Sequence, residues 1–231
     1  MHRPQFAGDK IYHIYNRGVE KRKIFLNDKD YLRFIHNLFE FNDENPVINT
    51  DYYFNTFITK QDNLNKKRTR KLLVDILVFV LMPNHFHFVL RQRKEGGIVK
   101  FMQKLGTGYT MYFNKKNNNR VGSLFQGRFK AVMLEKQAHF IHLPYYIHTN
   151  PLELTYRGST SIDAARMMEF LENYRWSSFL DYIGIKNFPS ITSRDFLSNF
   201  FSGENNYRKE MFKWLKDKDK HLKKMQTVLL D

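Results

Sequence analysis

Residues 72–91 read LLVDILVFVLMPNHFHFVLR, and this stretch decides the fold. Leu72–Leu81 is a dense run of aliphatic and β-branched residues, which is typical of a buried strand. Met82–Asn84 is a turn sequence. The next residues, His85–Arg91, alternate between polar and apolar side chains in HFHF and continue as VLR. The stretch therefore predicts two antiparallel strands joined by a tight turn.

The flanking segments complete a recurring order of elements. Before this stretch they predict a strand at Ile11–Asn16 and a helix at 28–41 that ends before Asn45-Pro46. After it they predict a helix at about Ile98–Asn114 and a strand at Phe129–Leu134. A last helix is predicted at Lys136–Asn150, interrupted at Pro144 and ended by Pro151. Strand, helix, two strands, helix and strand form a split βαββαβ unit. We therefore predict an α+β, ferredoxin-like fold with an antiparallel sheet. We place this domain at residues 1–155, with a basic insertion at about 49–71, and a helical C-terminal extension at 156–231.

Composition restricts the class of protein. With 38 Lys and Arg against 23 Asp and Glu, the chain carries a formal charge of +15, which favours a polyanionic partner, nucleic acid first. An anionic membrane surface is the competing partner, but no long basic amphipathic helix supports it. The absence of cysteine excludes disulfides, thiolate metal sites and a cysteine nucleophile.

Hydropathy gives no sign of a membrane segment. The longest apolar run, Ile76–Met82, is far too short to span a bilayer, and Met1–Lys10 holds no apolar signal-peptide core. We expect a soluble, cytoplasmic protein with no membrane partner.

Two pairs of residues carry the candidate chemistry. His85 and His87 share one face of their strand because side chains alternate, so their imidazoles can converge on one metal ion. Tyr146 and Asn150 stand four residues apart and share one face of their helix. Taken alone, either pair also fits an ordinary packed or hydrogen-bonded arrangement.

Together the two pairs suggest metal-assisted phosphoryl chemistry. Two imidazoles and an amide oxygen, without thiolate, suit Mg²⁺ or Mn²⁺ better than structural zinc. Such a metal holds a scissile phosphate as Lewis acid and template, and a nearby tyrosine is a candidate nucleophile. Tyr145 is the alternative nucleophile, but it lies about 100° around the helix from Tyr146 and does not share the face of Asn150.

Five strings in order resemble one family. MPNHFHFVL (82–90) resembles the histidine–hydrophobic–histidine motif of the single-tyrosine HUH transposases of small insertion sequences, and YIHTNP (146–151) resembles the tyrosine helix of their REP-associated branch. The other three strings that fit this branch are YHIYNRG (12–18), GSLFQGRFK (122–130) and YRWSSF (174–179). The resemblance covers roughly residues 8–183, and it departs at Phe125, where the family commonly carries tryptophan.

The resemblance implies a specific activity and site. Members of the family are metal-dependent endonucleases and strand transferases for single-stranded DNA, and they form a 5′-phosphotyrosine intermediate. His85 and His87 would be metal ligands, Asn150 the third ligand and Tyr146 the nucleophile, with Mg²⁺ or Mn²⁺ as the cofactor. The REP-associated branch implies a hairpin-forming DNA partner, and relatives that exchange the tyrosine helix imply a possible homodimer. The ferredoxin-like fold also belongs to the family.

Other residues and other functions stay open at this stage. Candidate contacts to the DNA backbone are Arg17, Lys66, Lys67, Arg68, Arg70, Lys115, Lys116, Arg120 and Arg128, of which Arg17 and Arg128 lie in matched strings. We expect His148 to be a core or hydrogen-bonding histidine. The rival functions are a non-catalytic, RNA-binding module with the same split fold, which needs exposed aromatic residues on its sheet, and a phosphodiesterase that uses water and leaves Tyr146 idle.

Overall fold

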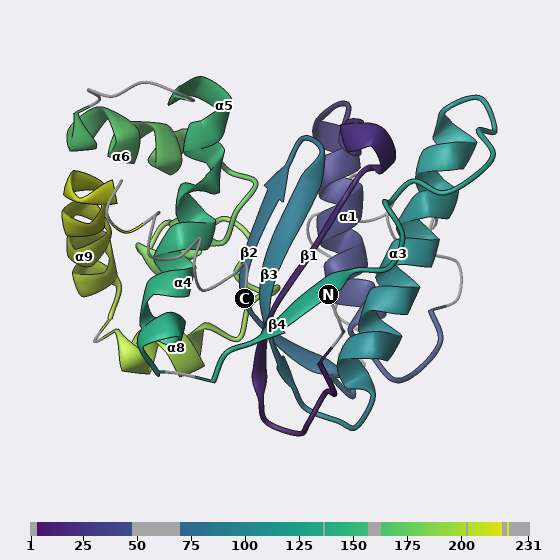
Figure 1. Cartoon of the computed structure of the whole chain (residues 1–231), viewed down its shortest axis with the longest axis horizontal. Coiled ribbons are helices and arrows are strands. Elements are labelled where there is room, and N and C mark those ends of the chain that lie inside the picture. The colour runs from purple at the N-terminus through teal and green to yellow at the C-terminus, as the bar shows by residue number, and fades with distance from the viewer. Residues whose placement is uncertain are drawn as a thin grey trace.

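A four-stranded antiparallel sheet forms the centre of the molecule in a computed structural model of the chain (Figure 1). The structure describes residues 4–47, 70–135, 137–156, 163–201, 203–218 and 221. The strands are β1 (Ile11–Arg17), β2 (Val74–Met82), β3 (His85–Gln92) and β4 (Lys130–Met133), in the spatial order β2-β3-β1-β4. Helix α1 (Asp28–Phe41) connects β1 to β2, and α3 (Gly97–Lys116) connects β3 to β4. The predicted split βαββαβ arrangement with an antiparallel sheet is therefore confirmed.

The pairing of β1 with β3 sorts the side chains onto two faces. Tyr15 lies opposite His87 and Arg17 opposite His85 in the register. The alternate residues of both strands, such as Ile14 and Phe88, join the apolar core beneath α1 and α3. Residues directly opposite one another share a face of the sheet, so the histidines lie on the face away from α1 and α3.

The second face is covered by α4 (Gln137–Thr149) and by elements that follow it (Figure 1). These elements are η2 (Asn150–Leu152), α5 (Glu153–Tyr156), α6 (Ala164–Asn173), α7 (Phe179–Tyr182), α8 (Arg194–Phe200) and α9 (Glu204–Lys216). Elsewhere in the chain, a short 3-10 turn, η1 (Val19–Lys21), follows β1. Ile147 of α4, Met168 of α6 and Trp214 of α9 share one core with the outer face of β2. The C-terminal helical extension is present in this form, whereas the boundary at 155/156 stays a prediction.

Pro144 lies inside α4, which runs without a break from Gln137 to Thr149. The interruption predicted at this residue is therefore wrong. Tyr145 and Ile147, which follow Pro144 in the helix, are both buried in the core shared with β2. Packing of this apolar helix compensates for the hydrogen bond that proline cannot donate.

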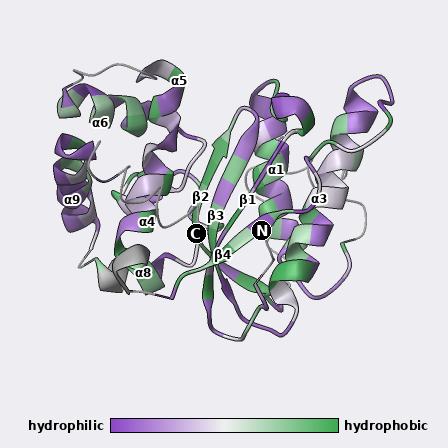
Figure 2. Cartoon of the chain, in the orientation of Figure 1, coloured by the Kyte–Doolittle hydropathy of each residue, from purple (hydrophilic) through white to green (hydrophobic). Residues whose placement is uncertain are grey.

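Strand β2 is buried along its whole length although it lies at the edge of the sheet, and Figure 2 shows it as almost uniformly hydrophobic. The segment around Trp176–Ser178 covers this edge. Its Ser178 N–H donates to the carbonyl of Phe79 at 3.0 Å, and the carbonyl of Trp176 accepts from the Leu81 N–H at 2.9 Å. An edge strand that would otherwise expose unpaired backbone groups is thus closed by the chain itself.

Within the described residues, none of the helices is long and apolar enough to cross a membrane. The predicted insertion at 49–71 falls almost entirely outside the described residues.

Two glycines of α3 provide a test of helix packing. A Cβ at Gly97 would collide with the carbonyl oxygen of Leu73, whereas a Cβ at Gly106 would meet no atom within 4 Å. We expect Gly97→Ala to lower the free energy of unfolding by about 1–3 kcal/mol through overpacking. Gly106→Ala should raise it by up to about 1 kcal/mol, because alanine is the better helix former. Urea denaturation of both variants beside the wild type measures the difference, and equal effects of the two substitutions would contradict this account.

Candidate active site

His85 and His87 lie side by side on β3. Their ring centroids are 5.1 Å apart, and the two ring planes are nearly perpendicular, at 87°. Phe86 and Phe88 point to the opposite face and fill the core under α1. The alternation expected from the sequence therefore brings the two imidazoles together.

Each of these imidazoles is held through its Nδ1 atom. His85 Nδ1 lies 2.7 Å from Asn84 Oδ1, and His87 Nδ1 lies 2.9 Å from His13 Nε2. Among the described residues, neither histidine has a hydrogen bond at Nε2. Metal-ligating histidines are commonly oriented in this way, with one ring nitrogen bound to a neighbour and the other available to the ion.

His13 and Tyr15 belong to the site and were missed by the sequence analysis. His13 is almost fully buried, and its ring stacks on Tyr15 and on His87, both at a centroid distance of 5.1 Å. Tyr15 in turn stacks on His87 at 5.6 Å. Alternation within IYHIYN shows that His13 and Tyr15 share a strand face, but nothing local shows that β3 lies beside β1.

Burial keeps the site histidines uncharged at neutral pH. It lowers the pKa of His13 to about 3. Burial, together with the positive charge of Arg17, lowers the pKa of His85 to about 4. Burial lowers the pKa of His87 well below its ordinary value, and the neighbouring His13 and His85 add to the effect. Neutral imidazole is the form that binds metal ions.

Asn150 follows α4 directly and is nearly buried. Its side-chain Nδ2 donates to the backbone carbonyls of Tyr146 at 3.0 Å and of Ile147 at 3.2 Å. These two bonds fix the orientation of the amide, and Oδ1 has no hydrogen bond among the described residues. Asn150 therefore combines a satisfied nitrogen with an available oxygen donor.

Tyr146 lies on the sheet side of α4, partly buried and next to Tyr15. Burial raises the pKa of Tyr146 above its ordinary value, and the charge of Glu153 and the hydroxyl of Tyr15 raise it further. Because Tyr15 also stacks on His87, Tyr146 stands on the same face of the sheet as the imidazoles. Its raised pKa means that the phenol does not ionise without help from a cation or a base.

Tyr145 points elsewhere. It is 4% exposed and stacks on Tyr207 with a centroid distance of 4.9 Å, and it also contacts Phe201 edge-on. These partners belong to the core between α4 and the C-terminal helices. The two consecutive tyrosines thus occupy different surroundings, as the helical rotation between them predicts.

The donor atoms fit a metal of the Mg²⁺ or Mn²⁺ type. Two imidazole Nε2 atoms and the Oδ1 of Asn150 are left available by hydrogen bonds made at the other atom of each group. In the described part of the chain, no three His, Cys, Asp or Glu side chains are grouped so as to hold a metal ion. Asn150 Oδ1 is the oxygen donor that the sequence resemblance assigns to one set with His85 and His87.

A comparison with protein families decides the relationship. The family model described as "Transposase IS200 like" matches residues 35–150, half of the chain, and this range includes both histidines, Tyr146 and Asn150. The chain belongs to the IS200-like transposase family. The family expected from the five sequence strings is thus confirmed.

The transposase also resembles a solved structure in its fold. A solved structure described as a REP-associated tyrosine transposase bound to a REP hairpin is similar to the chain, with 13% identity and a TM-score of 0.47. The match covers 81% of this chain and 88% of that one. No curated protein matches the transposase.

Arg17 and Arg128 are both exposed. Arg128 belongs to the 122–129 loop (Gly122–Phe129), which precedes β4, and Arg17 lies next to this loop. Arg17 ends β1 and donates from Nε to Gln126 Oε1. Arg128 forms no hydrogen bond or ion pair with the described residues. Both side chains are therefore available at the protein surface.

Three other predicted DNA contacts have internal roles. Lys116 pairs with the buried Asp30 at 2.5 Å. Arg120 donates to Asn114 Oδ1 and to loop carbonyls, and Arg70 donates to carbonyls at the end of α1 and lies over the Phe39 ring. Lys115 is exposed at the end of α3, and Lys66, Lys67 and Arg68 lie outside the described residues.

His148 anchors α4 through both of its ring nitrogens. Its Nδ1 lies 2.7 Å from the Tyr207 hydroxyl and its Nε2 lies 2.8 Å from Ser178 Oγ, so the predicted hydrogen-bonding role is confirmed. Burial lowers the pKa of His148 from 6.5 to about 3. The helix that carries Tyr146 is therefore tied both to α9 and to the segment that covers β2.

This histidine should make the transposase less stable in acid. Between pH 6.5 and about 3 the unfolded chain carries a proton on the ring and the folded chain does not, so stability falls as pH falls. We expect the free energy of unfolding of His148→Gln to depend less steeply on pH between 6 and 4, by about 1.4 kcal/mol per pH unit. Urea denaturation across this range measures the slope, and a slope equal to that of the wild type would refute the assignment.

Proposed function

We propose that this transposase is a metal-dependent endonuclease and strand transferase for single-stranded, hairpin-associated DNA, with Tyr146 as the nucleophile. One observation carries the proposal. Two neutral imidazoles, each oriented through Nδ1, lie on the sheet face to which α4 brings Tyr146. The chain belongs to a transposase family, and transposases cleave and join DNA, a reaction that such a group of side chains could carry out.

The proposed reaction exchanges one phosphoester for another. The Tyr146 oxygen attacks the phosphorus, the bond from phosphorus to the 3′ oxygen breaks, and a 5′-phosphotyrosine forms. The phenol gives up its proton, and the departing 3′ oxygen takes up a proton to become a hydroxyl. Because the new ester keeps the energy of the old one, a 3′-hydroxyl can later attack it and rejoin strands without ATP.

His85, His87 and Asn150 would hold Mg²⁺ or Mn²⁺. When bound, such an ion polarises the scissile phosphate and aligns it for in-line attack. Burial raises the pKa of Tyr146, so the protein alone disfavours the phenolate. A cation close to the Tyr146 hydroxyl would therefore be needed to favour the phenolate and make the tyrosine reactive.

The DNA partner is inferred from charge and from the resemblance to REP-associated members. A net charge of +15 favours a polyanion, and Arg17 and Arg128 are the exposed arginines near the site. The homodimer and the cytoplasmic location stay predictions.

An RNA-binding module of the same topology is disfavoured by the covering of the sheet. Such modules stack bases on aromatic residues of an open sheet face. Here α1 and α3 cover one face, and α4 with the C-terminal helices covers β2 and part of β3 on the other (Figure 1).

Covalent trapping tests the nucleophile. We expect a labelled pool of single-stranded hairpin DNAs to form a denaturation-resistant adduct with the wild type in Mn²⁺ or Mg²⁺ but not in EDTA. Tyr146→Phe and His87→Ala should form none, whereas Tyr145→Phe should form it normally, since its ring only packs in the core. Gel electrophoresis under denaturing conditions measures the adduct.

Other outcomes of the trapping assay point away from the proposal. Cleavage without an adduct, unchanged in Tyr146→Phe, would indicate a phosphodiesterase that uses water. Loss of the adduct in Tyr145→Phe but not in Tyr146→Phe would transfer the role of nucleophile to Tyr145.

Metal binding tests the role of His13 without relying on activity. His13→Phe keeps a stacking ring but removes the nitrogen that holds His87 Nδ1. We expect it to weaken Mn²⁺ binding by about 10–100-fold, the usual effect of losing such a partner. Electron paramagnetic resonance of free Mn²⁺ measures the affinity, and His36→Phe, a buried histidine of α1, is the control. Equal affinity in His13→Phe and the wild type would show that His13 does not orient the ligand.

A further inference from the structure

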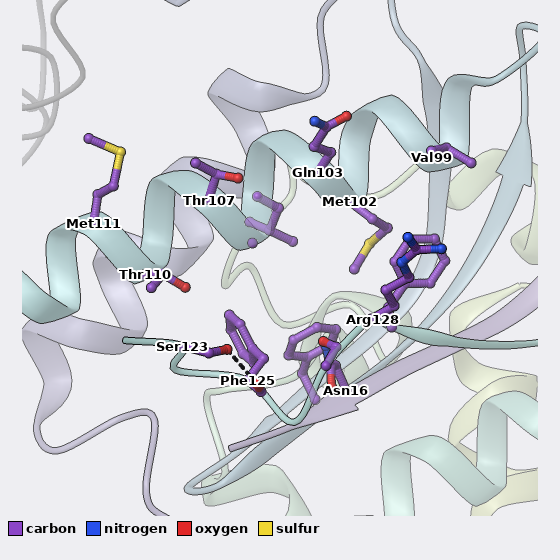
Figure 3. A pocket seen from close by; sticks show the side chains of 15 residues that line it. Asn16, Val99, Met102, Gln103, Thr107, Thr110, Met111, Ser123, Phe125 and Arg128 are labelled. Atoms are coloured by element: carbon purple, nitrogen blue, oxygen red, sulfur yellow. Dashed lines mark hydrogen bonds between the residues drawn. The ribbon is translucent and has the colours of Figure 1, made fainter. Parts of the chain in front are cut away.

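A groove lies between α3 and the 122–129 loop, and the chemistry assigned so far does not use it. It is a cavity of about 730 Å³, within the range of about 300–1,000 Å³ of ordinary ligand sites. In Figure 3, Met102 and Thr110 point from α3 toward the loop segment that carries Phe125. The groove is therefore large enough for a nucleotide.

The lining combines apolar surfaces with uncharged hydrogen-bonding groups. Met102, Phe125 and Phe129 supply the apolar part. Gln103, Thr107 and Thr110 have no side-chain hydrogen bond among the described residues, and of these Thr110 points toward the loop in Figure 3. Arg128 is the one charged side chain among the described lining residues, and no carboxylate lies among them. A flat, uncharged ring with polar edges, attached to a phosphate, matches this set of groups.

Gly106 borders the open space of the groove. Two glycines stand close together in α3, and a Cβ at Gly108 would collide with the Phe41 ring, so packing against α1 explains that residue. A Cβ at Gly106 would meet nothing within 4 Å, and Gly106 lines the groove. Packing therefore does not explain Gly106, and the free space there means that only a large side chain would fill the groove.

The groove is connected to the candidate active site through the end of β1. Asn16 lines the groove and donates from Nδ2 to the carbonyl of Gly127 at 3.3 Å. The next residue, Arg17, binds Gln126 of the same loop and lies opposite His85 in the sheet register. A DNA strand that leaves the histidines past Arg17 would thus reach Arg128 and the groove.

We propose that this groove receives an unpaired base of the single-stranded DNA next to the hairpin, with Arg128 on its phosphate. The inference rests on the proposed function, because it takes DNA as the substrate. Apolar contact with Met102, Phe125 and Phe129 holds the base, and Thr110 contacts its edge.

Binding measurements on full-length protein test the groove. The probe is a labelled hairpin with short single-stranded tails of equimolar bases, compared in EDTA with the same hairpin carrying abasic tails. We expect the wild type to prefer the base-bearing tails by about tenfold, which corresponds to about 1.4 kcal/mol and to the contribution of one stacked base. Gly106→Leu, which fills the groove, should abolish the preference but still bind the abasic probe, and Gly106→Ala should keep it. Fluorescence anisotropy measures the affinities, and circular dichroism confirms folding.

The outcomes separate this inference from the proposed function. If Gly106→Leu keeps the full preference, or the wild type shows none, the groove does not receive a base, while hairpin binding and the covalent adduct still support the function. If the wild type binds neither probe and forms no adduct, the proposed function fails and the groove inference fails with it. Iodouracil placed in the tails provides a second readout, since its photo-crosslinks should map to the 122–129 loop or α3, and crosslinks only elsewhere would overturn the proposal.

Discussion

The antiparallel register between β1 and β3 is the constraint on which the site depends. It sets Tyr15 opposite His87 and Arg17 opposite His85, so one sheet face gathers the polar rings and the other gathers Ile14, Phe86 and Phe88. A slip of one residue would move every side chain of a strand to the opposite face. It would expose the aromatic core and separate His13 from His87 at the same time. Folding and chemistry are therefore specified by the same pairing.

The helix that carries Tyr146 is fixed near its C-terminal end. Asn150 closes the last turn of α4 on itself by bonding to its carbonyls, and His148 ties the helix to Ser178 and to Tyr207 of α9. Ser178 belongs to the segment that covers the edge of β2, and it also binds the backbone of Phe79. The C-terminal elements thus determine where the candidate nucleophile stands, although the family match ends at residue 150.

Much of this arrangement follows from local sequence. Alternation in HFHFVL predicts a shared face for His85 and His87, and the helical period separates Tyr146 from Tyr145. The role of His13 could not be predicted, because it depends on the register between β1 and β3. The covering of β2 by Trp176–Ser178 depends on a contact between residues about a hundred positions apart in the chain. The continuity of α4 through Pro144 likewise depends on the core that packs around the helix.

The basic residues show most clearly why spacing alone is insufficient. A charge run such as NKKRTRK suggests phosphate contacts, yet Arg70 is occupied by the carbonyls at the end of α1. Lys116 offsets the buried charge of Asp30, and Arg91 with Arg93 offsets that of Asp75, because an unpaired buried carboxylate would be strongly destabilising. A charge that neutralises a buried group is not available to release counterions from DNA. Of the predicted contacts in the described part of the chain, Lys115, Arg17 and Arg128 are exposed; Arg128 belongs to the 122–129 loop and Arg17 binds it. Arg17 and Arg128 thus place two exposed charges where the candidate active site meets the groove.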